Sequence, residues 1–159
     1  MLLNQKINMH KTTMNLNLDN ETLFKECVEV LNAEILPWDE SFQMKEKFKK
    51  LYPITTWGKI NWDKISIKIE VGYNPNNVIS AYNELIPTSN TVVYILWSDA
   101  TIPIIKVNLE KVLEYFDYVT CVSFEKFIFN PTSGLIIEIL TNGMITTGLV
   151  SSLKQNPKS

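Results

Sequence analysis

The 159-residue sequence contains no arginine, because all 15 of its basic side chains are lysines. Lysine lacks the planar guanidinium fork that grips a phosphate or carboxylate through two parallel hydrogen bonds. Specific reading of nucleic-acid bases depends heavily on that fork. The net charge of −2 does not favour a polyanionic partner either. We therefore expect no direct binding to nucleic acid.

Histidine, cysteine and glycine are also scarce. The one histidine, His10, precedes the predicted fold, which leaves the fold without the usual base of a Ser-His or Cys-His catalytic pair. Cys27 and Cys121 are too few for a disulfide framework and lack metal-ligand spacing, so we expect two buried thiols. The five glycines match no phosphate-binding fingerprint. The sequence thus predicts no histidine-based catalytic pair, no cofactor and no metal site.

Long apolar runs are absent as well. No stretch approaches the roughly 18 apolar residues of a membrane-spanning helix, and the first twenty residues lack the apolar centre of a signal peptide. We therefore expect a cytoplasmic protein with no membrane partner. The length and the hydrophobic content of 45% predict a single domain at 20–150, preceded by a flexible leader at 1–19 and followed by a flexible tail at 151–159.

Hydrophobic periodicity predicts an α+β fold, in which about four helices pack on a largely antiparallel, twisted sheet that ends in a C-terminal hairpin. The helices are predicted from Asp19 or Asn20 to Leu31, from Asp39 to Leu51, from Asn74 to Ile86 and from Asn108 to Phe116. The strands are predicted at Ile65–Val71, Thr91–Trp97, Val119–Phe124, Phe127–Phe129, Leu135–Leu140 and Ile145–Val150. Asn142-Gly143 predicts a type I′ turn between the last two strands.

Lysines and aromatic residues are interleaved at 38–70, a mixture typical of sites that bind single-stranded nucleic acid. Seven lysines face five acids there, a surplus of only two positive charges. We interpret the lysines as a solvated face of the second helix, with Phe42 and Phe48 on its inner face. Trp57 and Trp62 are interpreted as core anchors.

The second half of the chain has the opposite charge, since residues 71–150 contain three lysines and seven acids. Glu110 and Glu114 lie one turn apart on the predicted fourth helix. Asp117 follows near its C-terminal end, where the helix dipole makes a negative charge slightly unfavourable. A face that merely keeps the helix soluble would explain each residue singly. Together, these carboxylates would attract a basic partner.

Three stretches carry a resemblance to a known family: YPITTWGKINWDKI from Tyr52, VVYILWSDATIPIIKVNLEKVLEYFDYVTCVSFEKFIFNP from Val92, and GLIIEILTNGMITTGL from Gly134. Over residues 20–150 the chain resembles the small immunity proteins of bacterial contact-dependent growth inhibition and related polymorphic-toxin systems. The resemblance lies in the pattern of strands and their spacing. It implies a non-enzymatic protein that binds the C-terminal toxin domain delivered by a neighbouring cell and blocks its active site or substrate surface.

Many toxins of such systems are nucleases, and the basic substrate cleft of a nuclease would suit an acidic surface. The resemblance therefore implies a cognate toxin domain, basic and a nuclease, as the partner of this chain. The carboxylates expected to bind the toxin are Asp99, Glu110, Glu114, Asp117 and Glu125.

Two other classes of function stay open. A small enzyme would use Asp99, Glu125 or Glu138 as acid and base, with a pair such as Asp99 and Glu138 in a concave apolar pocket lined by tyrosine and tryptophan. The simpler interpretation is a turn at Asp99 and an outward side chain at Glu138. An oligomerising adaptor would instead use the last strand, Ile145–Val150, as an exposed edge that pairs with another chain.

Overall fold

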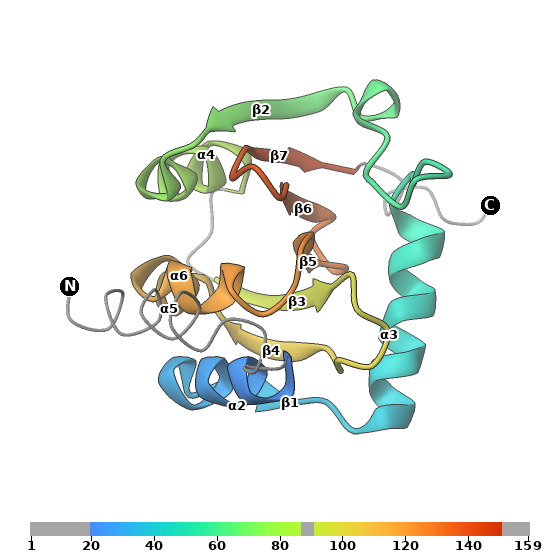
Figure 1. The fold of residues 1–159 in the computed structure, drawn as a ribbon. Helices are drawn as coiled ribbons and strands as arrows, with labels where there is room; N and C mark the ends of the chain where they lie inside the picture. Colours follow the sequence, from blue (N-terminus) through green and yellow to red (C-terminus); the bar gives the residue numbers. More distant parts are fainter. Residues whose placement is uncertain (1–19, 87–90, 151–159) are drawn as a thin grey trace.

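In the computed structural model, which describes residues 20–86 and 91–150, seven antiparallel strands form one sheet (Figure 1). The order across the sheet is β1 (Glu34–Ile35), β4 (Ile105–Asn108), β3 (Val92–Trp97), β5 (Lys126–Asn130), β6 (Leu135–Ile139), β7 (Ile145–Leu149) and β2 (Ile67–Gly72). The expected leader and tail lie outside the described residues.

Helices cover both faces of this sheet (Figure 1). One face carries α2 (Asn20–Leu31), α4 (Val78–Leu85), α5 (Leu109–Glu114) and α6 (Phe116–Thr120), and the other carries α3 (Trp38–Leu51) with the segment 52–65 after it. Alternation along β3 supplies both sides: Val93 and Ile95 pack toward the four helices, whereas Tyr94 and Leu96 pack toward α3. The predicted α+β fold on an antiparallel sheet is confirmed.

The first two helices were predicted to within one residue at each end. In α2, Leu23, Phe24, Cys27 and Leu31 are buried at helical spacing, as expected. The third helix begins where the cap signal indicates, since the side chain of Asn74 accepts a hydrogen bond of 2.9 Å from the backbone N–H of Asn76. Its first turn, Pro75–Asn77, is a 3₁₀-helix that leads into α4.

The prediction of a strand at Val119–Phe124 is wrong. The fourth helix breaks at Tyr115 and resumes as α6, and Val119 and Val122 are buried three residues apart, as on a helix. Their β-branched side chains favour a strand intrinsically, but packing of this segment against α2 and the sheet overrides that preference. Cys121, expected within a strand, instead follows the end of α6 and is half-buried.

The two ends of the sheet also differ from expectation. The short strands β1 and β4 were not predicted, and β7 is not an edge, because β2 pairs with its outer side. An adaptor that pairs through Ile145–Val150 therefore has no open edge there.

The β6–β7 turn is not type I′, since Gly143 has a φ of 94° whereas Asn142 does not have a positive φ. The Gly143 N–H donates to the Leu140 carbonyl at 2.8 Å, as in a type I turn followed by a glycine bulge.

Two aromatic residues that were expected in the core are exposed. The side chain of Trp57 is 84% exposed and that of Phe42 is 63% exposed, although Phe48 is buried as predicted. Trp62 is half-buried. Residues 53–65 form an extended cover over the α3 face, and helical or strand periodicity does not indicate which side chains of such a segment face inward.

Candidate functional site

The sheet separates two layers whose charges differ in sign. The helices α2, α4, α5 and α6 carry two lysines, Lys25 and Lys111, and seven carboxylates: Glu21, Glu26, Glu29, Glu84, Glu110, Glu114 and Asp117. We call this set of side chains the acidic layer. Across the sheet, α3 and the segment 52–65 carry six lysines and four acids. The net charge of −2 thus conceals an acidic face and a basic face.

The carboxylates of the acidic layer point toward solvent, with Glu26 and Asp117 half-buried and the others exposed. Lys25 lies 3.3 Å from Glu21, but the two side chains are 71% and 72% exposed, and a pair so exposed contributes little. Lys111 lies over the ring of Tyr115, 5.7 Å from its centroid. The lysines therefore leave most of the negative charge of the layer accessible to a partner.

Carboxylates of the acidic layer raise the pKa values of two nearby tyrosines. Burial raises the pKa of Tyr118 on α6 above its ordinary value, and the carboxylate of Glu26 on α2 raises it further. Burial also raises the pKa of Tyr82 on α4, and Glu110 on α5 adds to that effect. Glu26 of α2 and Glu110 of α5 thus each act on a side chain of another helix in the layer.

Three of the five expected site residues, Glu110, Glu114 and Asp117, come together in the acidic layer. The Glu110 carboxylate accepts a hydrogen bond of 2.7 Å from the hydroxyl of Thr91, which orients it at the start of α5. The acids of α2 join the same surface. They were not predicted to do so because the charge surplus was counted along the chain, and only the packing of α2 on α6 brings them together.

Asp99 lies at the border of the acidic layer, next to the start of α2. Its carboxylate accepts hydrogen bonds from the Thr101 hydroxyl at 2.7 Å, the Thr101 N–H at 2.9 Å and the Asn20 amide at 3.0 Å. These bonds, the Thr101 hydroxyl first, hold the pKa of Asp99 below its ordinary value. The turn expected at this residue is confirmed.

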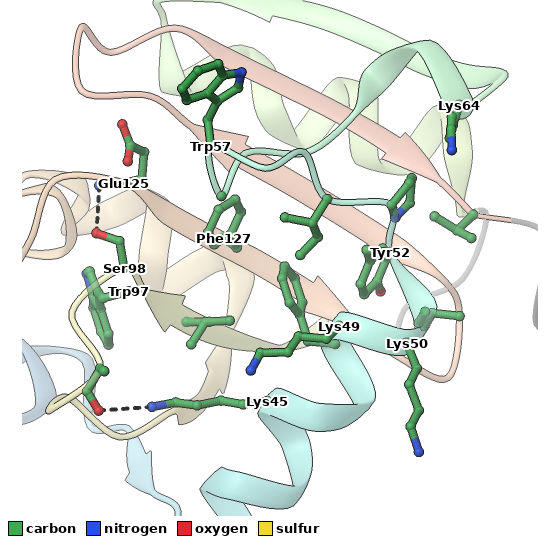
Figure 2. A pocket seen from close by; sticks show the side chains of 18 residues that line it. Lys45, Lys49, Lys50, Tyr52, Trp57, Lys64, Trp97, Ser98, Glu125 and Phe127 are labelled. Atoms are coloured by element: carbon green, nitrogen blue, oxygen red, sulfur yellow. Dashed lines mark hydrogen bonds between the residues drawn. The ribbon is translucent and has the colours of Figure 1, made fainter.

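A second feature, the lysine cleft, opens on the opposite side of the sheet between α3, residues 53–58 and the ends of β3 and β5 (Figure 2). It has a volume of about 960 Å³ and is lined by Lys45, Lys49, Lys50, Lys64 and one carboxylate, Glu125. The basic and aromatic stretch that was interpreted as a solvated helix face thus forms one wall of a concave surface.

Glu125, the fifth expected site residue, lies apart from the acidic layer, at the rim of the lysine cleft (Figure 2). Its carboxylate accepts a hydrogen bond of 3.0 Å from the Thr141 hydroxyl and lies 3.9 Å from the Lys59 ammonium group. Its backbone N–H donates to the hydroxyl of Ser98 at 3.4 Å. Glu125 is therefore separated from Glu110, Glu114 and Asp117 by the sheet.

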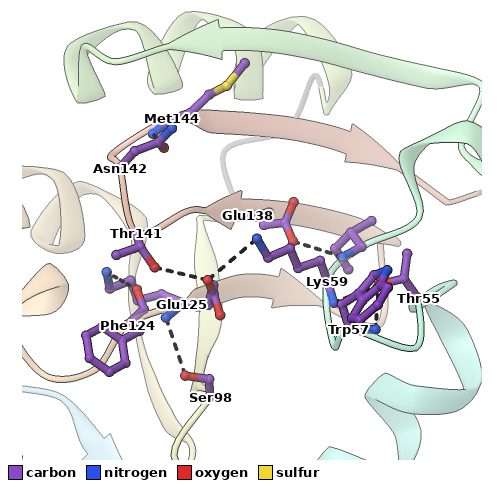
Figure 3. A network of polar contacts seen from close by, with 12 residues as sticks. Thr55, Trp57, Lys59, Ser98, Phe124, Glu125, Glu138, Thr141, Asn142 and Met144 are labelled. Carbon is purple, nitrogen blue, oxygen red and sulfur yellow. Dashed lines mark hydrogen bonds and ion pairs between the residues drawn. The ribbon is translucent and has the colours of Figure 1, made fainter.

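The expectation that Glu138 points outward is wrong, because residues 53–65 cover this face of the sheet. The side chain, which is labelled in Figure 3, is 3% exposed. Its two oxygens accept hydrogen bonds from the Ile60 N–H at 2.9 Å and the Trp62 indole N–H at 2.7 Å. Asp99 and Glu138 thus belong to separate hydrogen-bond networks, and neither lines the lysine cleft. The carboxylate pair that an enzyme would require is not assembled by these two residues.

Other ligand classes find little support in the part of the chain that the structure describes. There, no three side chains of His, Cys, Asp or Glu gather in a way that could hold a metal ion. No helix of residues 20–86 and 91–150 is long and apolar enough to cross a bilayer. The features that stand out in the described residues are two charged surfaces of opposite sign.

Comparison with protein families yields a match that spans both surfaces. The family described as CdiI immunity protein EcoliA0-like matches residues 21–148. The matched region runs from the first turn of α2 into β7 and so contains the acidic layer and nearly all of the lysine cleft. No curated protein matches the sequence.

Proposed function

The chain belongs to the CdiI immunity protein family, and we propose that it binds and neutralises the toxin domain of its cognate contact-dependent growth inhibition system. The family match over residues 21–148 is the observation that carries this proposal. On this account the protein acts by binding and not by catalysis, and it protects the cell that makes it. The toxin must be met where it acts, so the proposal includes a cytoplasmic location.

We further propose that the toxin is a basic nuclease and that it docks on the acidic layer. Exposed carboxylates at Glu110 and Glu114, together with Asp117 and the acids of α2, present spaced negative charges on a firm helical scaffold. A nuclease surface that attracts phosphates would also attract such a row of carboxylates. Complementary charge speeds association above the unsteered rate of roughly 10⁵ to 10⁶ M⁻¹s⁻¹. Asp99 at the border of the layer is included in this interface, whereas Glu125 lies on the other side of the sheet and is left out of it.

The test uses the cognate toxin domain, co-expressed and then purified with this protein. We expect rescue of growth and a stoichiometric complex. Reversing the charge of the layer in the triple variant Glu110→Lys, Glu114→Lys, Asp117→Lys should slow association roughly tenfold or more. The matched control Glu34→Lys, Asp63→Lys, Glu70→Lys changes three exposed acids outside the layer by the same total charge. It should leave the association rate within about twofold of the original.

Two outcomes would count against the proposal at different levels. Growth arrest by the toxin despite full expression of this protein would refute neutralisation itself. Equal association rates for the triple variant and its matched control would leave neutralisation intact and move the interface away from the acidic layer.

A further inference from the structure

The lysine cleft combines an apolar interior with cationic walls. Its apolar lining includes Phe48, Leu96 and Phe127, and the ring of Trp57 stands at its wall with 84% of its surface exposed (Figure 2). The volume of about 960 Å³ is in the range that accommodates a small ligand or a few residues of an extended peptide. Exposed aromatic rings beside a concavity are typical anchors of protein interfaces.

The charge of the lining determines what kind of ligand suits the cleft. Lys45, Lys49, Lys50 and Lys64 line it against the single carboxylate of Glu125. A neutral or basic ligand would bring these ammonium groups against an uncharged or like-charged surface and strip part of their water without a compensating partner. A ligand with carboxylates would instead pair with them.

The walls of the cleft are already held in place. The ammonium group of Lys45, which is labelled in Figure 2, donates to the carbonyl oxygens of Ala100 at 3.4 Å and Ile102 at 3.3 Å. These bonds tie α3 to the opposite wall of the cleft. Partial burial lowers the pKa of Lys45, and Asp99 opposes that shift. The loop that carries Trp57 is fixed through Thr55, whose hydroxyl oxygen accepts a hydrogen bond of 3.2 Å from the backbone N–H of Trp57. A preformed site loses little conformational freedom on binding.

We propose that the lysine cleft binds an extended acidic segment of a partner protein, whose carboxylates pair with the lysines while an apolar side chain packs beside Trp57. This role goes beyond toxin neutralisation on the acidic layer, because the two surfaces lie on opposite sides of the sheet. A single nucleic-acid strand is less suited to the cleft. Strand-binding grooves stack successive bases on several exposed rings, whereas Trp57 is the one exposed ring among the residues that line the cleft and its other rings are buried.

The chain's own C-terminal residues are not the occupant that charge favours. Val150 lines the cleft, and residues 151–159 follow it in the sequence. They contain Lys154 and Lys158 and no acid, and would add like charge to a lysine-lined cavity. Charge complementarity therefore favours an acidic segment supplied by another protein.

The experiment is an NMR titration of the isotope-labelled full chain with a nine-residue probe peptide of eight acidic residues around a central leucine. We expect saturable shifts at the backbone amides that line the cleft and at the indole N–H of Trp57. We also expect weakening by about fivefold or more when salt is raised tenfold. The variant Lys49→Glu, Lys50→Glu should lose binding, as should the separate variant Lys64→Glu. Lys45 stays unchanged because its bonds to Ala100 and Ile102 support the fold.

The matched control Lys47→Glu, Lys106→Glu changes two exposed lysines outside the cleft and should bind the probe as the original does. The spectra themselves verify that each variant is folded. Absence of saturable shifts at millimolar peptide, shifts centred elsewhere, or equal loss in the control would overturn the proposal. Tighter binding at the cleft by a nine-nucleotide thymidine strand would overturn it in favour of nucleic acid. Rescue from the toxin is scored separately, so failure here leaves the immunity function untouched.

Discussion

At the residue scale, the carboxylate of Glu138 organises the face of the sheet that bears the lysine cleft. It is buried on β6, and its oxygens accept the backbone N–H of Ile60 and the indole N–H of Trp62. These bonds fasten the segment after α3 to the middle of the sheet. A buried acceptor that satisfies two donors is costly to alter, because both donors then lose their partner in a place water does not reach.

We expect Glu138→Gln to lower the free energy of unfolding by about 1–3 kcal/mol. The amide would place its own N–H₂ group against either the Ile60 or the Trp62 donor. Urea denaturation of the variant and the original measures the difference. The comparison variant Trp62→Phe removes the indole bond together with part of the packing of the ring, and it leaves the bond from Ile60 in place. A Glu138→Gln variant as stable as the original would contradict the role given to this carboxylate.

The buried thiol of Cys27 should make the stability of the protein depend on pH in the alkaline range. Burial in the core, with Cys121 adding to the effect, raises the pKa of this thiol from 9.0 to about 12. In the unfolded chain the thiol loses its proton near its ordinary pKa, so above that pH the folded state binds more protons than the unfolded state. The contribution of the Cys27 thiol to the free energy of unfolding is therefore fully present below about pH 9 and is lost as the pH rises toward about 12.

In Cys27→Ala this loss should be missing. Between pH 9 and 12, the free energy of unfolding of the original should fall more steeply than that of the variant, by up to about 1.4 kcal/mol per pH unit. Titration of lysines and tyrosines is common to both proteins and cancels in the difference. Denaturation curves at half-unit steps of pH give the two slopes. Parallel slopes would show that Cys27 titrates normally in the folded state.

At the element scale, substitution of a glycine in each of two turns can test how the hairpins at the end of the chain are built. Gly134 and Gly143 both have positive φ, at 86° and 94°, where a side chain is strained. They differ in their surroundings. An added Cβ at Gly134 would overlap the carbonyl oxygen of Val150, whereas at Gly143 the nearest atom is Cδ1 of Tyr73 at 3.8 Å.

Gly143→Ala should therefore lower the free energy of unfolding by about 1–2 kcal/mol, the cost of the left-handed backbone alone. Gly134→Ala should cost clearly more, because it carries the same strain and also displaces the backbone at the end of β7. Thermal denaturation of the two variants gives both values. Equal losses would show that the strand end yields without cost and that the close approach at Gly134 does not matter.

Elements were predictable where a single periodic pattern decided the outcome. The buried stripe of α2 and the strand predicted at Leu135–Leu140, which is β6, are examples, and both are confirmed. Prediction failed where a local preference opposed tertiary packing, as in the β-branched segment around Val119 that forms α6. It also failed for Trp57, because no periodicity indicates which side of an irregular loop is covered.

At the scale of the whole molecule, the arrangement of charge is the property that the net value of −2 conceals. The sequence indicates the acids of α5 and α6, but the acids of α2 join them only through the packing of helices that are distant in the chain. The lysine cleft is likewise assembled from α3, the ends of β3 and β5, and the loop between α3 and β2. Opposite charge on opposite sides of one sheet gives the protein a defined orientation in the field of a charged partner.

Hydrogen exchange followed by mass spectrometry, on this protein alone and bound to its cognate toxin domain, tests the central claim most directly. Neutralisation through the acidic layer predicts that α2, α5 and α6 gain the strongest protection in the complex. In the matched measurement, the triple variant Glu110→Lys, Glu114→Lys, Asp117→Lys should show reduced protection there at the same toxin concentration. Protection confined to α3 or the edge strand β2, or no complex with the toxin at all, would contradict the account.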